Sequence, residues 1–152
     1  MDFPNFKQCS DSPSFADEEL GIKAAFKSGA AKIGMVADDR WLVFGSLRLD
    51  AEGLAEVGSS VASEVLIILT YWETRSVHLG RLTKAAPSAR RQRTVGGGDD
   101  SGGGFRLMDA YFNLDLKATC SVDPHPGHYW VVFQLGKFVS QVLEFEVVAP
   151  PA

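Results

Sequence analysis

The stretch "AYFNLDLKAT", residues 110–119, has the clearest alternation of apolar and polar side chains in the chain. Its apolar members are Phe112, Leu114, Leu116 and Ala118, and the polar residues between them are Asn113, Asp115 and Lys117. Successive side chains of a β-strand point to opposite faces of the sheet. This period of two therefore predicts a strand with an inward apolar face and an outward polar face.

Further segments have the composition of strands. Residues 65–72 and 129–135 are apolar at nearly every position, which is typical of strands that are covered on both faces. Other predicted strands lie at residues 31–37, 41–49, 76–82 and 138–148. Residues 15–28 fit two alternatives equally, because Ser14 and Gly29 could cap a helix while the apolar residues from Leu20 to Phe26 alternate like a strand.

Seven or eight strands with at most one or two short helices predict an all-β fold. The alternation of strands and helices that makes a parallel sheet is absent, so we expect two antiparallel sheets packed as a β-sandwich. A jelly roll is favoured over an immunoglobulin-like sandwich for two reasons. The connections at 50–60 and 84–104 are long, and the cysteine–tryptophan–cysteine spacing of immunoglobulin domains does not occur.

The 152 residues predict an extended N-terminal arm at 1–14 and a single sandwich domain at 15–152. Residues 84–104 combine basic side chains with six glycines and predict a flexible loop. Neither a signal peptide nor a membrane span is indicated, because the longest apolar run, "VLIIL", is far shorter than the ~20 residues that cross a bilayer. We therefore expect no membrane partner and a cytoplasmic or virion location.

Basic residues are concentrated in one part of an otherwise acidic chain. The net charge is −4, yet residues 81–95 contain five basic residues and no acidic one. They are Arg81, Lys84, Arg90, Arg91 and Arg93. Arginine binds phosphate bidentately, so this run predicts contact with nucleic acid or another acidic partner. The alternative is a solvated loop whose charge offsets the acidic remainder. Any nucleic-acid contact would ignore sequence, because residues 84–104 contain no aromatic side chain for base stacking.

Catalytic and metal-binding motifs are sparse. His125 and His128 lie in "DPHPGHYW", but a metal site needs a third ligand and usually a fourth. We interpret this segment as a proline-fixed turn that leads into a buried strand, with both histidines solvated at the edge of a sheet. No nucleophile elbow or phosphate-binding glycine motif occurs. We therefore expect no metal, no cofactor and no enzymatic activity.

The closing segment "GKFVSQVLEFEVVAPPA", residues 136–152, resembles the last strand of the jelly-roll coat proteins of small RNA viruses, in which an alternating strand ends in proline. The resemblance implies a structural subunit that forms a homo-oligomer, with its arm and apolar faces packed against other copies. The alternative is a monomeric β-sandwich module that recognises a protein through its loops. Self-association separates these two hypotheses.

Overall fold

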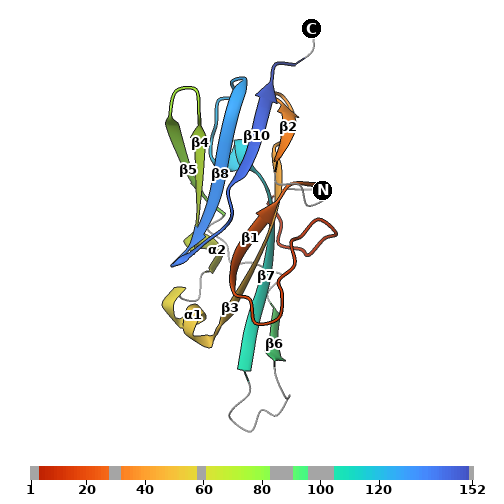
Figure 1. Cartoon of the computed structure of the whole chain (residues 1–152), viewed down its shortest axis with the longest axis vertical. Coiled ribbons are helices and arrows are strands. Elements are labelled where there is room, and N and C mark those ends of the chain that lie inside the picture. The colour runs from red at the N-terminus through yellow and green to blue at the C-terminus, as the bar shows by residue number, and fades with distance from the viewer. Residues whose placement is uncertain (1–3, 28–31, 58–60, 83–90, 96–104, 151–152) are drawn as a thin grey trace.

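Two β-sheets packed face to face form the protein (Figure 1). The computed structural model describes residues 4–27, 32–57, 61–82, 91–95 and 105–150. The first sheet has the order β1-β3-β7-β6, with β1 Gly21–Ala25, β3 Leu42–Asp50, β7 Phe105–Asp115 and β6 Arg91–Val95. The second has the order β2-β10-β8-β4-β5, with β2 Lys32–Val36, β10 Leu143–Val148, β8 Gly127–Leu135, β4 Val65–Tyr71 and β5 Ser76–Arg81. A two-residue strand, β9 Phe138–Val139, pairs with β8.

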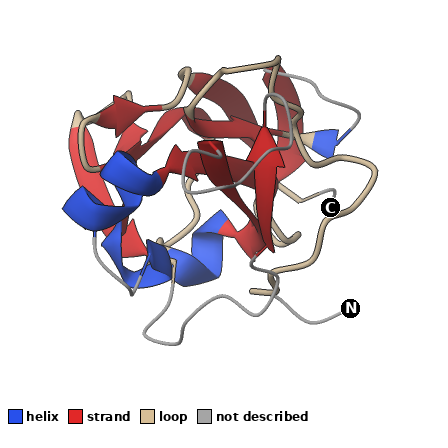
Figure 2. Cartoon of the chain, turned by 90° about the horizontal axis from the view of Figure 1, so that it is seen from below, coloured by secondary structure: helices blue, strands red, loops and turns tan. Residues whose placement is uncertain are grey.

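The prediction of an all-β sandwich is confirmed. Every strand pair of the described residues is antiparallel except β2 and β10, which run parallel. The helices are short and lie at the margin of the strands (Figure 2). They are α1 Ala51–Val57, α2 Val61–Glu64 and α3 Leu116–Thr119.

The strand order corrects the preference for a jelly roll. The order β1-β3-β7-β6 matches strands A, B, E and D of an immunoglobulin domain, and β10-β8-β4-β5 matches strands G, F, C and C′ of the variable type. The connection after β3, whose length favoured a jelly roll, instead contains α1 and α2 at one end of the sandwich. The architecture is therefore an immunoglobulin-like arrangement of strands.

A tyrosine hydroxyl closes the turn that enters β8. The Tyr129 hydroxyl donates to the backbone carbonyl of His125 at 2.8 Å and accepts from the His125 backbone N–H at 3.2 Å. This is the tyrosine corner of immunoglobulin-like sandwiches. Two residues later, where antibody domains have the second cysteine of their disulfide, the chain has the buried Val131. Cys9 and Cys120 are both free, so packing alone joins the two sheets at this point.

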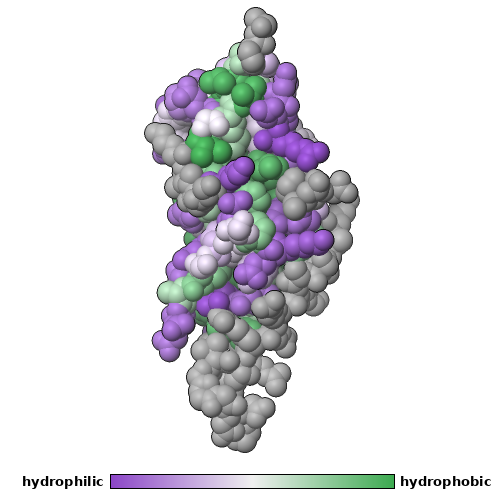
Figure 3. Space-filling model, turned by 90° about the vertical axis from the view of Figure 1, so that its right-hand side faces the viewer, coloured by the Kyte–Doolittle hydropathy of each residue, from purple (hydrophilic) through white to green (hydrophobic). Residues whose placement is uncertain are grey.

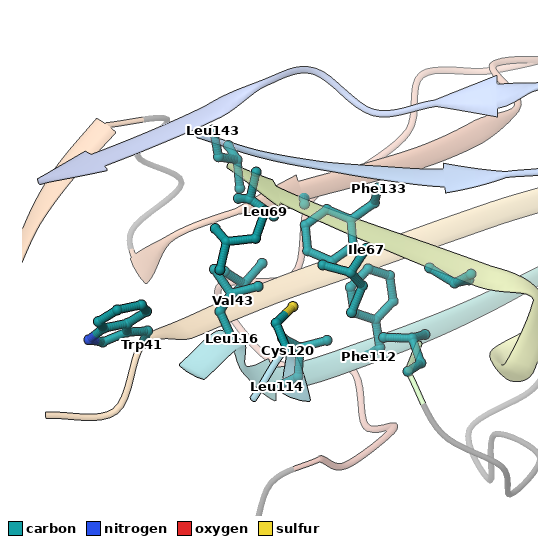
Figure 4. Packing of buried hydrophobic residues seen from close by; sticks show 14 of the residues in the cluster. Trp41, Val43, Ile67, Leu69, Phe112, Leu114, Leu116, Cys120, Phe133 and Leu143 are labelled. Atoms are coloured by element: carbon teal, nitrogen blue, oxygen red, sulfur yellow. The ribbon is translucent and has the colours of Figure 1, made fainter. Parts of the chain in front are cut away.

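The core between the sheets is aromatic and aliphatic (Figure 4). Trp41, Tyr129 and Phe145 form one group of rings, with centroids 5.1 to 5.4 Å apart. A side chain of this kind contributes about 1.5–3 kcal/mol when it is fully buried. Gly45 on β3 is required by the same packing, because a Cβ at this position would overlap the Phe112 ring.

One predicted strand ends earlier than its sequence pattern indicated, and another is interrupted. Residues 116–119 form α3 because Asp115 caps the helix, accepting from the Lys117 N–H at 3.0 Å. The Asp115 side chain also accepts from the Trp41 backbone N–H at 3.0 Å, which fixes the chain where the helix begins. Residues 138–148 form two strands, and Ser140 in the break between them donates its N–H to the Phe133 carbonyl at 2.8 Å.

The segment that the sequence presented as one loop, residues 84–104, contains a strand. Residues 91–95 form β6, which pairs with the first half of β7 from Arg91↔Asp109 to Val95↔Phe105. The rest of the segment lies outside the described residues. Residues 15–28, where helix and strand were equally favoured, contain β1.

The packing of the N-terminal arm against other copies stays a prediction, and the structure shows the arm in contact with its own chain. The arm lies on the outer face of its own first sheet, where it covers polar side chains. Buried Asn113 donates to the Asn5 side chain at 2.7 Å and to the Lys7 carbonyl at 2.8 Å, and Ser46 donates to the Pro13 carbonyl at 2.7 Å. The polar side chains of Asn113 and Ser46 on the outer face of the first sheet are thus hydrogen-bonded to groups of the arm.

A buried ion pair completes the same contact. The Arg48 Nε donates to Asp109 at 2.7 Å, and its guanidinium lies 5.2 Å from the centre of the Phe15 ring. The Arg48 Nη1 also donates to the Ala16 carbonyl at 3.2 Å. On the side that carries the arm and β2, hydrophilic and hydrophobic residues lie close together (Figure 3). The N-terminal segment therefore covers Ser46, Arg48 and Asn113 on the outer face of the first sheet.

Candidate interaction surface

The outer face of the second sheet is defined by the side chains that alternate with its core residues. In β4, Val65, Ile67 and Leu69 are fully buried, so Leu66, Ile68 and Thr70 point outward. Ile68 pairs with Val132 of β8 on one side and Leu79 of β5 on the other. We call the outward side chains of β4, β5, β8 and β10, with Trp72, the GFC face.

Large exposed hydrophobic side chains are concentrated on this sheet. Among the described residues there are seven of them, and all belong to strands of the second sheet or to the segments that flank these strands. They are Trp72, Val77, Leu79, Trp130, Val139, Val142 and Val148. Scattered apolar residues are normal on a protein surface, but their collection on one sheet makes this sheet the candidate interaction surface.

A stacked pair of tryptophans forms the most prominent feature of the GFC face. Trp72 follows β4 and Trp130 lies on β8, with ring centroids 4.5 Å apart and planes 20° from parallel. The two residues are 40% and 39% exposed. Arg75 places its guanidinium 3.6 Å from the centre of the Trp72 ring, so the Trp72 ring contacts both the Arg75 cation and the Trp130 ring. Tryptophan and arginine are the residues that most often dominate binding at protein interfaces.

Acidic residues border the face on the β10 side. Glu146 pairs with His128 in the register of β10 and β8, and its carboxylate lies 3.8 Å from the His128 ring. Glu73, in the turn after β4, accepts from the His128 backbone N–H at 2.9 Å and contacts the same ring at 3.2 Å. The hydrogen bond from the His128 backbone N–H is the main cause that lowers the pKa of Glu73, and the contact with the His128 ring lowers it further. At the end of the face near the turn between β4 and β5, the β10 side is therefore negatively charged and the β5 side carries the positive charge of Arg75.

The structure describes the backbone of three of the five predicted basic residues, which belong to two different sheets. Arg81 ends β5 in the second sheet and is exposed, whereas Arg91 and Arg93 belong to β6 in the first sheet. Lys84 and Arg90 lie outside the described residues. The prediction of a nucleic-acid contact therefore stays a prediction.

The two histidines do not converge. His125 lies in the turn before β8, 3.4 Å from Asp123, whereas His128 lies on β8 between two glutamates. Both histidines are exposed, as the sequence indicated, with His125 in the turn and His128 near the start of the strand that buries Tyr129. Within the described ranges, no three histidine, cysteine or acidic side chains are placed to hold one metal ion. No described helix has the length and apolar character needed to cross a membrane.

The sequence contained part of the signal for this face. Trp72, Trp130 and Phe133 all belong to segments that read as covered strands, and most of their aromatic side chains were expected in the core. The structure buries Phe133 but exposes both tryptophans. The outward Val77 and Leu79 of β5, separated by His78, were the additional signal that one face is apolar and uncovered.

Comparison with known proteins does not assign the chain to a family. No known family model matches the chain, and no curated protein matches it. Among solved structures, a similar chain is described as the crystal structure of the ZIG-8 IG1 homodimer. The two are 10% identical, the match covers 89% of this chain and 87% of that chain, and the TM-score is 0.25. The fold assignment accordingly rests on strand order and the tyrosine corner.

Proposed function

We propose that this protein is a non-enzymatic assembly subunit that self-associates through its GFC face. The observation that carries the proposal is the difference between the two sheets. The arm covers the outer face of the first sheet and satisfies its polar groups. The described residues provide no such cover for the second sheet, which exposes Trp72, Trp130, Val77 and Leu79.

Charge across the GFC face favours a second copy as the occupant. Two copies that pack face to face are related by a two-fold axis in the plane of contact. An axis parallel to the strands brings the β5 side of one copy against the β10 side of the other. Arg75 then lies opposite Glu146 of the partner subunit, because both residues are near the same end of the strands. An axis across the strands would instead set Arg75 opposite the partner's Arg81, and like charges repel.

The composition of the face also suits such a pairing. Stable interfaces have an apolar centre and a polar rim and bury about 800 Å² on each partner. Here Ile68, Val132 and Trp130 lie on the central strands, while Arg75 and Glu146 lie toward the sides. The tryptophan stack is already ordered in the single chain, which reduces the side-chain entropy that binding costs.

A charge exchange tests the pairing. Arg75→Glu and Glu146→Arg should each weaken self-association, because each places like charges together. An equimolar mixture of the two variants should form mixed pairs more tightly than either variant pairs with itself, as measured by light scattering after size-exclusion chromatography. If both variants pair as tightly as the wild type, the orientation is wrong; if the wild type itself is monomeric, the assembly function is wrong.

The alternative is a monomeric module that uses the same face to bind a different protein. A monomer in solution would favour it over the assembly subunit.

The contact with nucleic acid is a separate proposal, with Arg90, Arg91 and Arg93 as the residues to change. Their joint replacement by alanine should weaken filter binding of nucleic acid at low salt, because phosphate contacts dominate such binding. Equal retention by the wild type and the triple variant would remove this proposal. A coat-like role is a further proposal, and the size of the assembly in solution tests it.

A further inference from the structure

A second feature lies apart from the GFC face, at the end of the sandwich where β4 turns into β5 (top of Figure 1). There the chain forms a cleft of about 280 Å³ between this turn and the segment that leads into β8. Tyr71, Tyr129 and His125 line it with aromatic rings. The cleft is small compared with the pockets of about 300–1,000 Å³ that hold drug-sized ligands, so it suits a single head group.

The rings of the cleft are fixed by the fold. Tyr71 lies with its ring centroid 4.8 Å from that of Tyr129 and 6.2 Å from that of His125. The Tyr71 hydroxyl donates to the Pro126 carbonyl at 2.7 Å, and the Tyr129 hydroxyl donates to the His125 carbonyl at 2.8 Å. Both hydroxyl protons are thus used within the protein. Tyr129 is 1% exposed and supports the Tyr71 ring from the core, so Tyr71 and His125 are the rings that offer surface to a ligand.

The charge around the cleft is negative. Asp123 lines it and is exposed, and Glu73 lies beside Tyr71 at Gly127, where a Cβ would meet both side chains. No lysine or arginine is among the residues that line the cleft. Burial is the main reason why the pKa of Tyr129 is raised, and the negative charges of Glu73 and Asp123 raise it further. A cation is therefore the kind of ligand that this potential attracts.

The hydrogen-bonding groups of the cleft narrow the choice of cation. A primary ammonium group has three N–H donors that need acceptors when it leaves water. The Thr74 and Ser76 hydroxyls are 2.6 Å apart and bond to each other, and Asp123 carries the one carboxylate among the residues that line the cleft. A methylated ammonium group has few or no donors to satisfy and binds well against aromatic rings.

From this geometry we infer that the cleft of Tyr71, Tyr129, His125 and Asp123 binds a methylated ammonium group. Such a group occurs on small quaternary amines and on methylated lysine side chains of proteins. The site is independent of the GFC face, since Tyr129 and Tyr71 belong to the inner side of the sheet end while Trp130 points outward.

Titration of the full chain with tetramethylammonium chloride, followed by amide NMR, tests the inference. We expect saturable shifts of the amides in residues 71–78 and 123–129 in the millimolar range, with sodium chloride as the ionic-strength control. tert-Butanol has a similar shape without charge and should give no saturable shift. Choline and a trimethyl-lysine peptide then distinguish the two sources, because the natural class should saturate at the lower concentration.

Matched variants show whether the cleft itself is responsible. Asp123→Asn should weaken tetramethylammonium binding about tenfold, whereas Asp17→Asn removes an exposed charge in the turn before β1 and should leave it unchanged. Tyr71→Leu should abolish the shifts while the remaining amide spectrum stays folded.

Three results would overturn the inference. One is the absence of saturable shifts in the wild type. Another is equal weakening by Asp123→Asn and Asp17→Asn, which would mean unspecific attraction to an acidic protein. The third is binding of tert-butanol as tight as that of tetramethylammonium, which would mean a merely apolar cleft.

Discussion

Replacement of Trp130 by serine should abolish self-association while leaving the sandwich folded. The residue is 39% exposed, so about 100 Å² of its surface is available to a partner if the whole side chain has about 250 Å². At about 25 cal/mol per Å², this area contributes about 2.5 kcal/mol per copy. A two-fold interface contains the residue twice, so the loss is about 5 kcal/mol and the Kd rises by more than three orders of magnitude.

Sedimentation equilibrium over a wide range of protein concentration measures this change directly. Circular dichroism and the Tm should show that Trp130→Ser is folded, because the side chain points away from the core. Tyr111→Ser is the matched control, since Tyr111 is a half-buried aromatic residue on the first sheet. It should pair as tightly as the wild type. Unchanged pairing of a folded Trp130→Ser, or equal loss in both variants, would refute the assignment of the interface to the GFC face.

Three further changes test the account of the fold by chemical denaturation. Tyr129→Phe removes the hydrogen bond to the His125 carbonyl and should lower the free energy of unfolding by about 1–2 kcal/mol; no loss would contradict the role of the tyrosine corner. Asp109→Ala leaves the Arg48 charge buried without its 2.7 Å partner and should cost about 3–5 kcal/mol, against less than about 1 for an exposed pair. Burial raises the pKa of the Cys120 thiol from 9.0 to about 12, so its stabilising contribution is complete below pH 9 and is lost as the pH rises toward 12. Cys120→Ala should remove this part of the pH dependence, and an unchanged slope in urea titrations above pH 9 would contradict it.

The strands were predictable because their signal is local. Residues 65–71 and 129–135 indicate strands through nearly continuous apolar sequence, and the structure places β4 and β8 inside the second sheet. The expectation that both faces of these strands are covered is wrong among the described residues, because the outer face exposes Trp130. Strand order was not predictable in the same way, because it depends on contacts between segments that are distant in sequence. Tyr129 illustrates the difference, since its hydroxyl identifies an immunoglobulin-like turn only once its bond to His125 is known.

Side chains on the outer faces were harder to interpret than those in the core. Asn113 was correctly expected to point away from the core, but nothing in its own strand shows that Asn5 and Lys7 of the arm would bury it. Trp72 and Trp130 present the opposite case, because a tryptophan in an apolar segment reads as core wherever no second observation gives its direction. The register of β4 and β8 supplied that direction.

The mass of the wild-type protein in solution tests the central claim most directly. Sedimentation equilibrium should give a mass that rises with concentration from the 16.5 kDa of one chain to twice this value or to a larger even multiple. A mass that stays at 16.5 kDa at every concentration would contradict self-association and leave the monomeric binding module as the function to test.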